Sequence, residues 1–216
     1  MSSNPPWVVG MNSLSVITVF VIGFLSLVIN ATAAISPLDM IRSTTDQALK
    51  VLTDASDRGH APSQQQIEKM WEIVLPRFDM REMSQRVLGV NWDKLTEDQR
   101  KEFTSLFVEL VKNTYSDTLK RYATDAKFYF DQEHIEGDHA EVQTRILSPA
   151  QSEPFSVVYR LHREGEVWLV YDVVAENVSL VQNYRNQFSR IMAKSSGAGL
   201  IDALKRKLAE LKAPER

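Results

Sequence analysis

The residues best suited to chemistry in this sequence are acidic and histidine side chains gathered in one short stretch. Oxygen and imidazole groups at such density are possible metal ligands. Gly137 lies in the middle of the stretch and is typical of a turn, and neighbouring residues of a strand point to opposite faces. We therefore interpret the stretch as a solvated hairpin tip and expect no metal site. Its members are Asp131, Glu133, His134, Glu136, Asp138 and His139.

Asp172 is the best single candidate for an acid or base. It ends the segment Trp168–Asp172, where strict alternation places it on the same side as Trp168 and Val170. A carboxyl group beside apolar side chains can have a raised pKa, as general acids do. The alternative is a structural role, in which the carboxylate pairs with an arginine or with backbone amides. The sequence favours the structural role and leaves both open.

Common catalytic motifs are absent from the sequence. It has no Gly-x-Ser-x-Gly, no P-loop and no His-Glu-x-x-His, and it has no cysteine for a thiol nucleophile or a disulfide. The net charge of −3 and the pI near 5.9 argue against a nucleic-acid partner, which would need a basic surface. We expect no cofactor, no catalytic residues and no enzyme.

The elements that must position any site begin with helices. Apolar residues recur at helical spacing over 38–52 and 67–74, and Asp79 is placed to cap a short helix that ends at Gly89. The longest predicted helix begins at the capping box Thr96–Gln99 and carries one aromatic and aliphatic stripe from Phe103 to Tyr122. Core filling and the lining of a pocket are both compatible with such a stripe.

The period then changes from about four to two. Alternation over 128–135, 140–146, 155–161 and 167–173, with turns between, predicts an antiparallel meander of about four strands. Helical spacing returns over 180–192 and 200–211. The fold class is therefore α+β: N-terminal helices and one long helix packed on a twisted antiparallel sheet, followed by two C-terminal helices, in the shape of a cone. Such a cone is either filled by its own side chains or left open as an apolar cavity.

Residues 1–33 have the character of an export leader. Leu14 to Ile29 is mostly apolar, Ala31-Thr32-Ala33 has the small-x-small pattern of a cleavage site, and the first charged residue is Asp39. A cleaved signal peptide and a retained membrane anchor both fit this segment. In either case residues 34–216 form one domain beyond the membrane, which predicts a periplasmic location.

Three segments together resemble the MlaC-type (toluene-tolerance) periplasmic phospholipid-binding proteins. They are Phe78–Gly89, Thr96–Phe107 and, most distinctive, Val167–Phe188. The resemblance runs in order from about Pro37 to Leu211. It departs from the family at Asn177, where glycine is usual, but asparagine also tolerates a positive φ.

The resemblance implies a carrier that shuttles phospholipid and maintains lipid asymmetry. Its implied partners are an inner-membrane ABC transporter complex and an outer-membrane lipoprotein–porin complex. Acyl chains would lie in the apolar cavity. From the apolar faces we predict the lining residues Phe103, Phe107, Val111, Tyr115, Val157, Tyr159, Leu161, Val174, Val178, Tyr184 and Phe188.

Three other readings remain at this point. The first is a small cone-shaped enzyme that uses Asp172 as acid or base. The second is a membrane-tethered envelope scaffold factor that retains Leu14 to Ile29. The third keeps the carrier and changes its cargo to another envelope lipid, such as a hopanoid.

Overall fold

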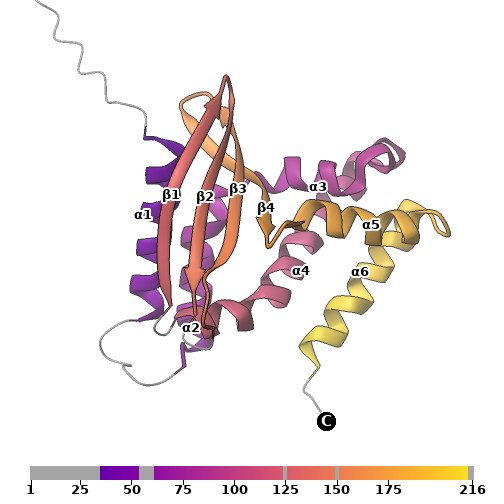
Figure 1. Ribbon diagram of the computed structural model, residues 1–216. Helices are drawn as coiled ribbons and strands as arrows, with labels where there is room; N and C mark the ends of the chain where they lie inside the picture. The colour runs from indigo at the N-terminus through magenta and orange to yellow at the C-terminus, as the bar shows by residue number, and fades with distance from the viewer. Residues whose placement is uncertain (1–34, 54–60, 124–125, 149–150, 214–216) are drawn as a thin grey trace, which may run out of the picture. The chain divides into compact units, whose positions relative to one another are not determined.

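Helices occupy both ends of the described chain, and an antiparallel sheet lies between them (Figure 1). The computed structural model describes residues 35–53, 61–123, 126–148 and 151–213. The predicted leader, residues 1–33, lies outside the described residues. The helical elements are α1 (Pro37–Leu52), α2 (Gln64–Val74), η2 (Leu75–Arg77), α3 (Met80–Leu88), η3 (Gly89–Lys94), α4 (Glu97–Ala123), α5 (Leu180–Met192) and α6 (Gly197–Lys212).

The helix boundaries follow local capping chemistry. Asp79 accepts the backbone N–H of Glu82 and caps α3, as predicted. Thr96 and Gln99 form both hydrogen bonds of the predicted capping box before α4. Gly89 ends α3 with a φ of 53°, a left-handed conformation that favours glycine.

The sheet is a meander in the order β1-β2-β3-β4-β5, with every pair antiparallel. It has five strands instead of about four, because a tight turn at Glu176 and Asn177, both at positive φ, returns the chain for a two-residue fifth strand. The predicted α+β class is confirmed. The strands are β1 (Lys127–Glu136), β2 (His139–Leu147), β3 (Phe155–Glu164), β4 (Val167–Ala175) and β5 (Val178–Ser179).

Of the N-terminal helices and the long helix that were expected to pack on the sheet, the one that lies along β1 and β2 is α1 (Figure 1). Glu133 of β1 accepts the backbone N–H of Leu38 at 2.7 Å, so a strand carboxylate satisfies the first turn of α1. The Arg42 guanidinium lies 5.2 Å from the centre of the Phe130 ring. The long helix instead packs mainly on α6.

The apolar interior forms two clusters. The larger one joins the end of α1 to α2, α3, α4, α5 and α6 and contains Phe103 and Phe107, both fully buried. The smaller one joins α1 to the sheet through residues such as Met40, Val142 and Leu161. The chain therefore has a helical core and a helix-on-sheet core.

The segment between α2 and α3 is attached to the sheet. Phe78 forms a parallel bridge with Val170 of β4, and the Asp79 N–H donates to the Val170 carbonyl at 2.9 Å. The Asp79 carboxylate also lies 3.0 Å from His162 Nε2 of β3. These contacts fix η2 and the start of α3 against β3 and β4.

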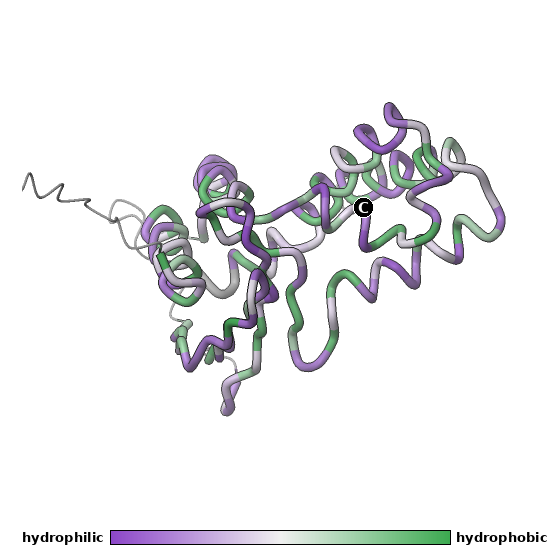
Figure 2. The backbone as a smooth tube through the Cα atoms, turned by 90° about the horizontal axis from the view of Figure 1, so that it is seen from above, coloured by the Kyte–Doolittle hydropathy of each residue, from purple (hydrophilic) through white to green (hydrophobic). Residues whose placement is uncertain are grey.

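The helices are amphipathic. Purple and green alternate along the helices in Figure 2, so polar residues interrupt the apolar ones. Among the described residues, no helix has an apolar stretch long enough to cross a bilayer.

Candidate functional site

An apolar cavity of about 420 Å³ lies between α1, α2, the second half of α4 and the inner face of the sheet. That volume is within the range of ordinary ligand sites. The wall is made almost wholly of aliphatic and aromatic side chains, with a few threonine and tyrosine hydroxyls. Its described residues are Ile41, Thr44, Thr45, Ala48, Leu49, Leu52, Met70, Trp71, Val74, Leu75, Arg77, Phe78, Met80, Met83, Val111, Tyr115, Thr118, Leu119, Phe128, Ile146, Phe155, Val157, Tyr159, Val173, Ala175 and Leu180.

Four of the predicted lining residues lie on this wall. Val111 and Tyr115 come from the second half of α4, and Val157 and Tyr159 come from β3. Among the described residues, the part of α4 that lines the cavity begins at Val111. The structure thus brings together one part of the helix stripe and one part of the strand alternation.

Four predicted aromatic residues pack on one another instead. The ring centres of Phe107 and Tyr184 are 5.2 Å apart, and those of Phe103 and Phe188 are 5.3 Å apart, both edge to face. Tyr184 and Phe188 stack at 5.6 Å. The four rings fill the core between α4 and α5, so they support the helices and do not line the cavity.

The other three predicted residues lie elsewhere on the sheet. Leu161 is fully buried in the smaller cluster, and Val178 is 62% exposed in β5. Val174 is half-buried and lies between Val173 and Ala175, which do line the cavity. Alternation along β4 therefore points Val174 to the opposite face.

A bulge in β4 explains why Val174 lies on the face away from the cavity. The register with β3 slips between Arg160 and Leu161, which pair with Asp172 and Val170, so Tyr171 is an extra residue in β4. The strict alternation assumed from the sequence changes face at that point. Asp172 consequently lies on the opposite face from Val170, which corrects the sequence interpretation.

Sequence reasoning missed the whole contribution of α1, α2, η2 and α3 to the wall, and further residues of α4, α5 and the strands. Thr45, Leu49 and Leu52 of α1 line the cavity, because this helix and not α4 covers β1 and β2. Their helical spacing was visible, but spacing alone does not say which helix faces the sheet. Arg77 of η2 gave no sequence signal and is the only charged side chain among the described lining residues.

Two tyrosines supply hydroxyl groups to the wall. Burial raises the pKa of Tyr159 to about 12. Burial, and to a lesser degree the nearby Tyr184, raises the pKa of Tyr115 to about 12. Both phenols are therefore neutral at any physiological pH, and they add no charge to the cavity.

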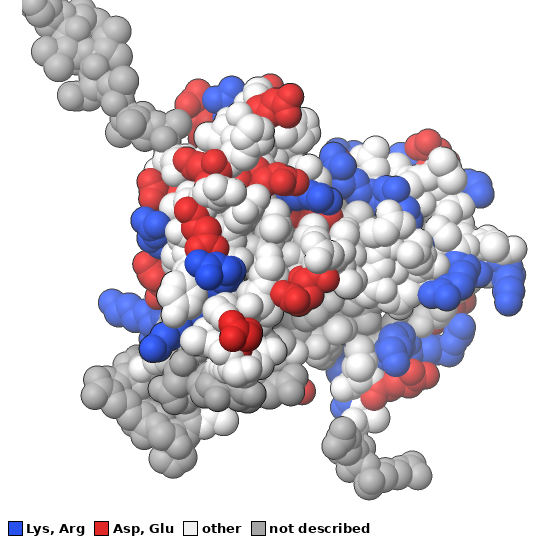
Figure 3. Space-filling model, in the orientation of Figure 1, with Lys and Arg blue, Asp and Glu red and all other residues white. Residues whose placement is uncertain are grey.

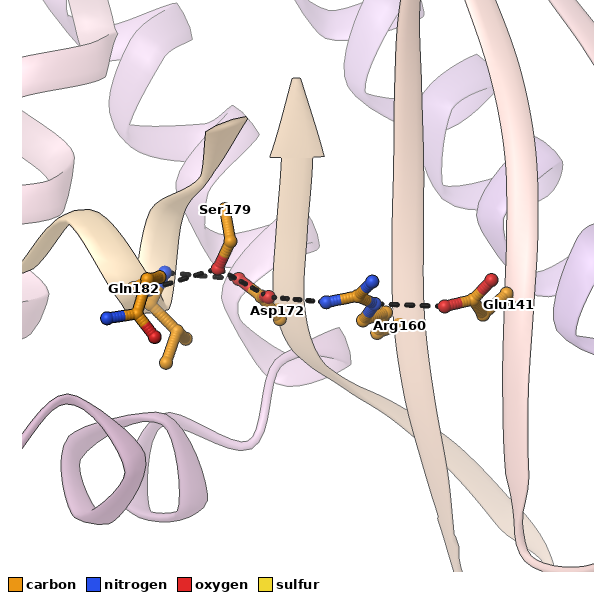
Figure 4. A network of polar contacts seen from close by, with 6 residues as sticks. Glu141, Arg160, Asp172, Ser179 and Gln182 are labelled. Carbon is orange, nitrogen blue, oxygen red and sulfur yellow. Dashed lines mark hydrogen bonds and ion pairs between the residues drawn. The ribbon is translucent and has the colours of Figure 1, made fainter. Parts of the chain in front are cut away.

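Asp172 holds a polar network on the other face of the sheet (Figure 4). Its carboxylate accepts the Ser179 hydroxyl at 2.7 Å and the Val181 N–H at 3.1 Å, and it lies 3.5 Å from Arg160. Arg160 also pairs with Glu141 at 2.9 Å. The network ties β2, β3 and β4 to the start of α5, which is the structural alternative considered for Asp172.

The acidic and histidine stretch serves the hairpin. Asp131 pairs with Arg145, which lowers the pKa of that carboxyl, and Asp138 pairs with Arg163. His139 packs edge to face on Tyr171 at 6.1 Å. Within the described ranges no group of three or more His, Asp or Glu side chains is arranged to hold a metal ion.

Charges are unevenly distributed over the surface. In Figure 3 acidic side chains gather over the strands and basic ones over the helices on the other side. Residues 127–179 contain ten acidic and four basic residues, whereas residues 180–212 contain two acidic and seven basic ones. The sheet end is therefore negative and the C-terminal helical end positive.

Together, the fold and the site define an α+β domain that encloses an apolar cavity between helices and a meander sheet. Residues 42–206 match the MlaC protein family. The chain belongs to this family, as the resemblance indicated.

Two similar proteins support membership of this family. The chain is 26% identical over 125 residues to the intermembrane phospholipid transport system binding protein MlaC of Haemophilus influenzae, a match that spans 56% of this chain and 58% of that protein. It is 21% identical over 164 residues to the toluene tolerance protein ttg2D of Pseudomonas putida, covering 76% of each.

A solved structure shares the fold. The phospholipid-binding protein of Ralstonia solanacearum, determined in complex with a phospholipid, superposes with a TM-score of 0.71 over 81% of this chain and 97% of that one. The sequence identity is 22%, so the likeness establishes the fold.

Proposed function

We propose that this chain is a phospholipid carrier, and that acyl chains occupy the cavity between α1, α2, α4 and the sheet. The observation that carries the proposal is an apolar cavity of about 420 Å³ in a member of the MlaC family. The named relatives support it, because one is a phospholipid transport binding protein and one fold neighbour was solved with a phospholipid bound. Neither name describes an enzyme, which fits a binding protein.

Elementary energetics explains why such a carrier is needed. A diacyl lipid has about 30 methylenes, and at about 0.8 kcal/mol each its transfer into water costs on the order of 25 kcal/mol. Free diffusion across an aqueous gap is therefore negligible. For the same reason the carrier delivers its cargo only in contact with a partner that receives the chains directly.

The proposed cellular role follows the family. Residues 1–33 direct export, and the domain acts in the periplasm between an inner-membrane ABC transporter complex and an outer-membrane lipoprotein–porin complex. In that role it helps to maintain lipid asymmetry. Val111, Tyr115, Val157 and Tyr159 contact the chains, while the Phe103, Phe107, Tyr184 and Phe188 cluster keeps α4 in place.

The test is the lipid content of the full chain purified after export. We expect about one phospholipid per protein by native mass spectrometry and lipid extraction. Leu49→Trp and Val111→Trp fill the cavity and should reduce the bound lipid several-fold. Leu49→Trp should disturb the fold less, because Leu49 is only half-buried. Val90→Trp is the matched control, since Val90 is 83% exposed and is not among the described lining residues. Lipid-free wild-type protein, or equal lipid in all variants, contradicts the proposal.

A further inference from the structure

Arg77 is the one charged residue among the described residues of the cavity wall. Every other described lining residue is uncharged, and most are aliphatic or aromatic. A guanidinium beside apolar groups loses part of its hydration, which is unfavourable unless an anion or hydrogen-bond acceptor replaces the water. The wall therefore presents one positive charge to whatever occupies the cavity.

No described residue neutralises this charge. Across residues 35–53, 61–123, 126–148 and 151–213, Arg77 has no ion pair and no side-chain hydrogen bond, and it is half-buried. The nearest acid along the chain, Asp79, is engaged by the Glu82 N–H and by His162. Arg86, nine residues further along, pairs with Glu82 at 2.8 Å.

The backbone that carries Arg77 is held in place. Pro76 precedes Arg77 and restricts the backbone there. Phe78 and Asp79 follow it, and both are attached to Val170 of β4, by the bridge and by the hydrogen bond described above. The root of the side chain is therefore fixed at the cavity by the sheet. A charged group held on a rigid element is the usual arrangement for ligand recognition.

We propose that Arg77 is an anion-binding subsite of the cavity, and that it pairs with the oxyanion of a lipid whose alkyl chains fill the apolar part. The planar guanidinium donates two parallel hydrogen bonds to a phosphate or a carboxylate, which a lysine does less well. This inference rests on the proposed function and adds to it: the cargo is an anionic amphiphile, and a neutral lipid of equal chain length binds less well. The anion is either the phosphate of a phospholipid or the carboxylate of a fatty acid.

The experiment measures lipid preference in the full chain. Delipidated protein is incubated with mixed vesicles that contain equal amounts of a phosphatidylglycerol, a fatty acid and the diacylglycerol with the same chains, and bound lipid is quantified by native mass spectrometry. We expect the wild type to prefer one anionic lipid over diacylglycerol by about tenfold, the value of one charged hydrogen-bonded contact. The preferred lipid identifies phosphate or carboxylate as the anion.

Three variants isolate the role of Arg77. Arg77→Gln should bind diacylglycerol as the wild type does and lose the tenfold preference, whereas Arg77→Lys should keep part of it. Arg81→Gln is the control, because Arg81 lines a separate depression beside Trp92 and Arg100. Urea unfolding of each variant confirms that the fold is retained.

The outcomes separate this inference from the proposed function. Binding of no lipid by the wild type overturns the carrier itself. Equal binding of diacylglycerol and both anionic lipids by the wild type, or an unchanged preference in Arg77→Gln, overturns the subsite and leaves the carrier intact. A loss of preference that Arg81→Gln shares equally also overturns it, because the effect is then one of net charge.

Discussion

His162 Nε2 lies 3.0 Å from Asp79 Oδ2, although 83 positions separate the two residues in the sequence. The other carboxylate oxygen of Asp79 accepts the Glu82 N–H at 2.8 Å. One side chain thus caps α3 and joins that helix to β3. Because Arg77 precedes this junction by two residues, the same contact holds one side of the cavity wall in place.

Replacing Asp79 should weaken this junction. We expect Asp79→Ala to lower the free energy of unfolding by about 1–2 kcal/mol, because the helix loses its N-cap and His162 loses its partner. Urea unfolding measures the change. Asp93→Ala is the control, since Asp93 is 88% exposed and its pairing with Arg100 at 3.6 Å should contribute little. Equal effects of the two substitutions would contradict a joining role for Asp79.

Asp172 should matter for stability and not for catalysis. Asp172→Ala removes a buried carboxylate with three partners, so we expect a loss of about 2–3 kcal/mol, against less than about 1 kcal/mol for Glu141→Ala at the exposed end of the network. Folded Asp172→Ala protein should keep its lipid, since Asp172 lies on the face away from the cavity. Lipid loss in fully folded variant protein would count against this assignment.

The aromatic cluster and the cavity wall should respond differently to truncation. Phe107→Ala opens a hole in a packed core and should cost about 3–5 kcal/mol in unfolding free energy. Leu119→Ala should cost less than half as much, because Leu119 is only partly buried and borders space that is already empty. Chemical unfolding of lipid-free protein compares the two, and similar losses would indicate a collapsed cavity.

Alkaline pH should destabilise the lipid-free protein. The raised pKa of Tyr115 and Tyr159, each about 12, means that the folded state keeps its phenol protons longer than the unfolded state, whose tyrosines ionise near pH 10. The contribution of these two tyrosines to stability is therefore fully present below pH 10 and is lost as the pH rises from 10 to 12. Tyr159→Phe should make that loss shallower in unfolding experiments at pH 9 and 11. An unchanged slope would show that Tyr159 is solvated.

Local patterns predicted the elements well because capping and periodicity are local. The Thr96–Gln99 box, the Asp79 cap, the positive φ of Gly89 and the turn at Asn177 all follow from single residues and near neighbours. The strand alternation holds within each regular run and changes face at the bulges in β1 and β4.

Which residues line the cavity depends on contacts between segments far apart in the sequence, and residue spacing carries no information about such contacts. Phe103 and Val111 belong to one apolar stripe and to one buried cluster, yet the first packs on Phe188 of α5 and the second also lines the cavity, because the second half of α4 borders α1 and α2 there. The extra residue at Tyr171 reverses the faces of β4 and moves Val174 off the wall. Arg77 was invisible because only the tertiary fold places it at the cavity.

The separation of acidic strands from basic C-terminal helices gives the domain an electric dipole (Figure 3). A dipolar particle turns as it nears a charged object. The domain therefore presents its basic helical end to a negative surface and its acidic strand end to a positive one. The turning torque acts over roughly the Debye length, about 8 Å at physiological ionic strength. Encounters are therefore aligned only in the last moments before contact, and added salt slows productive collisions without changing the fit once contact is made.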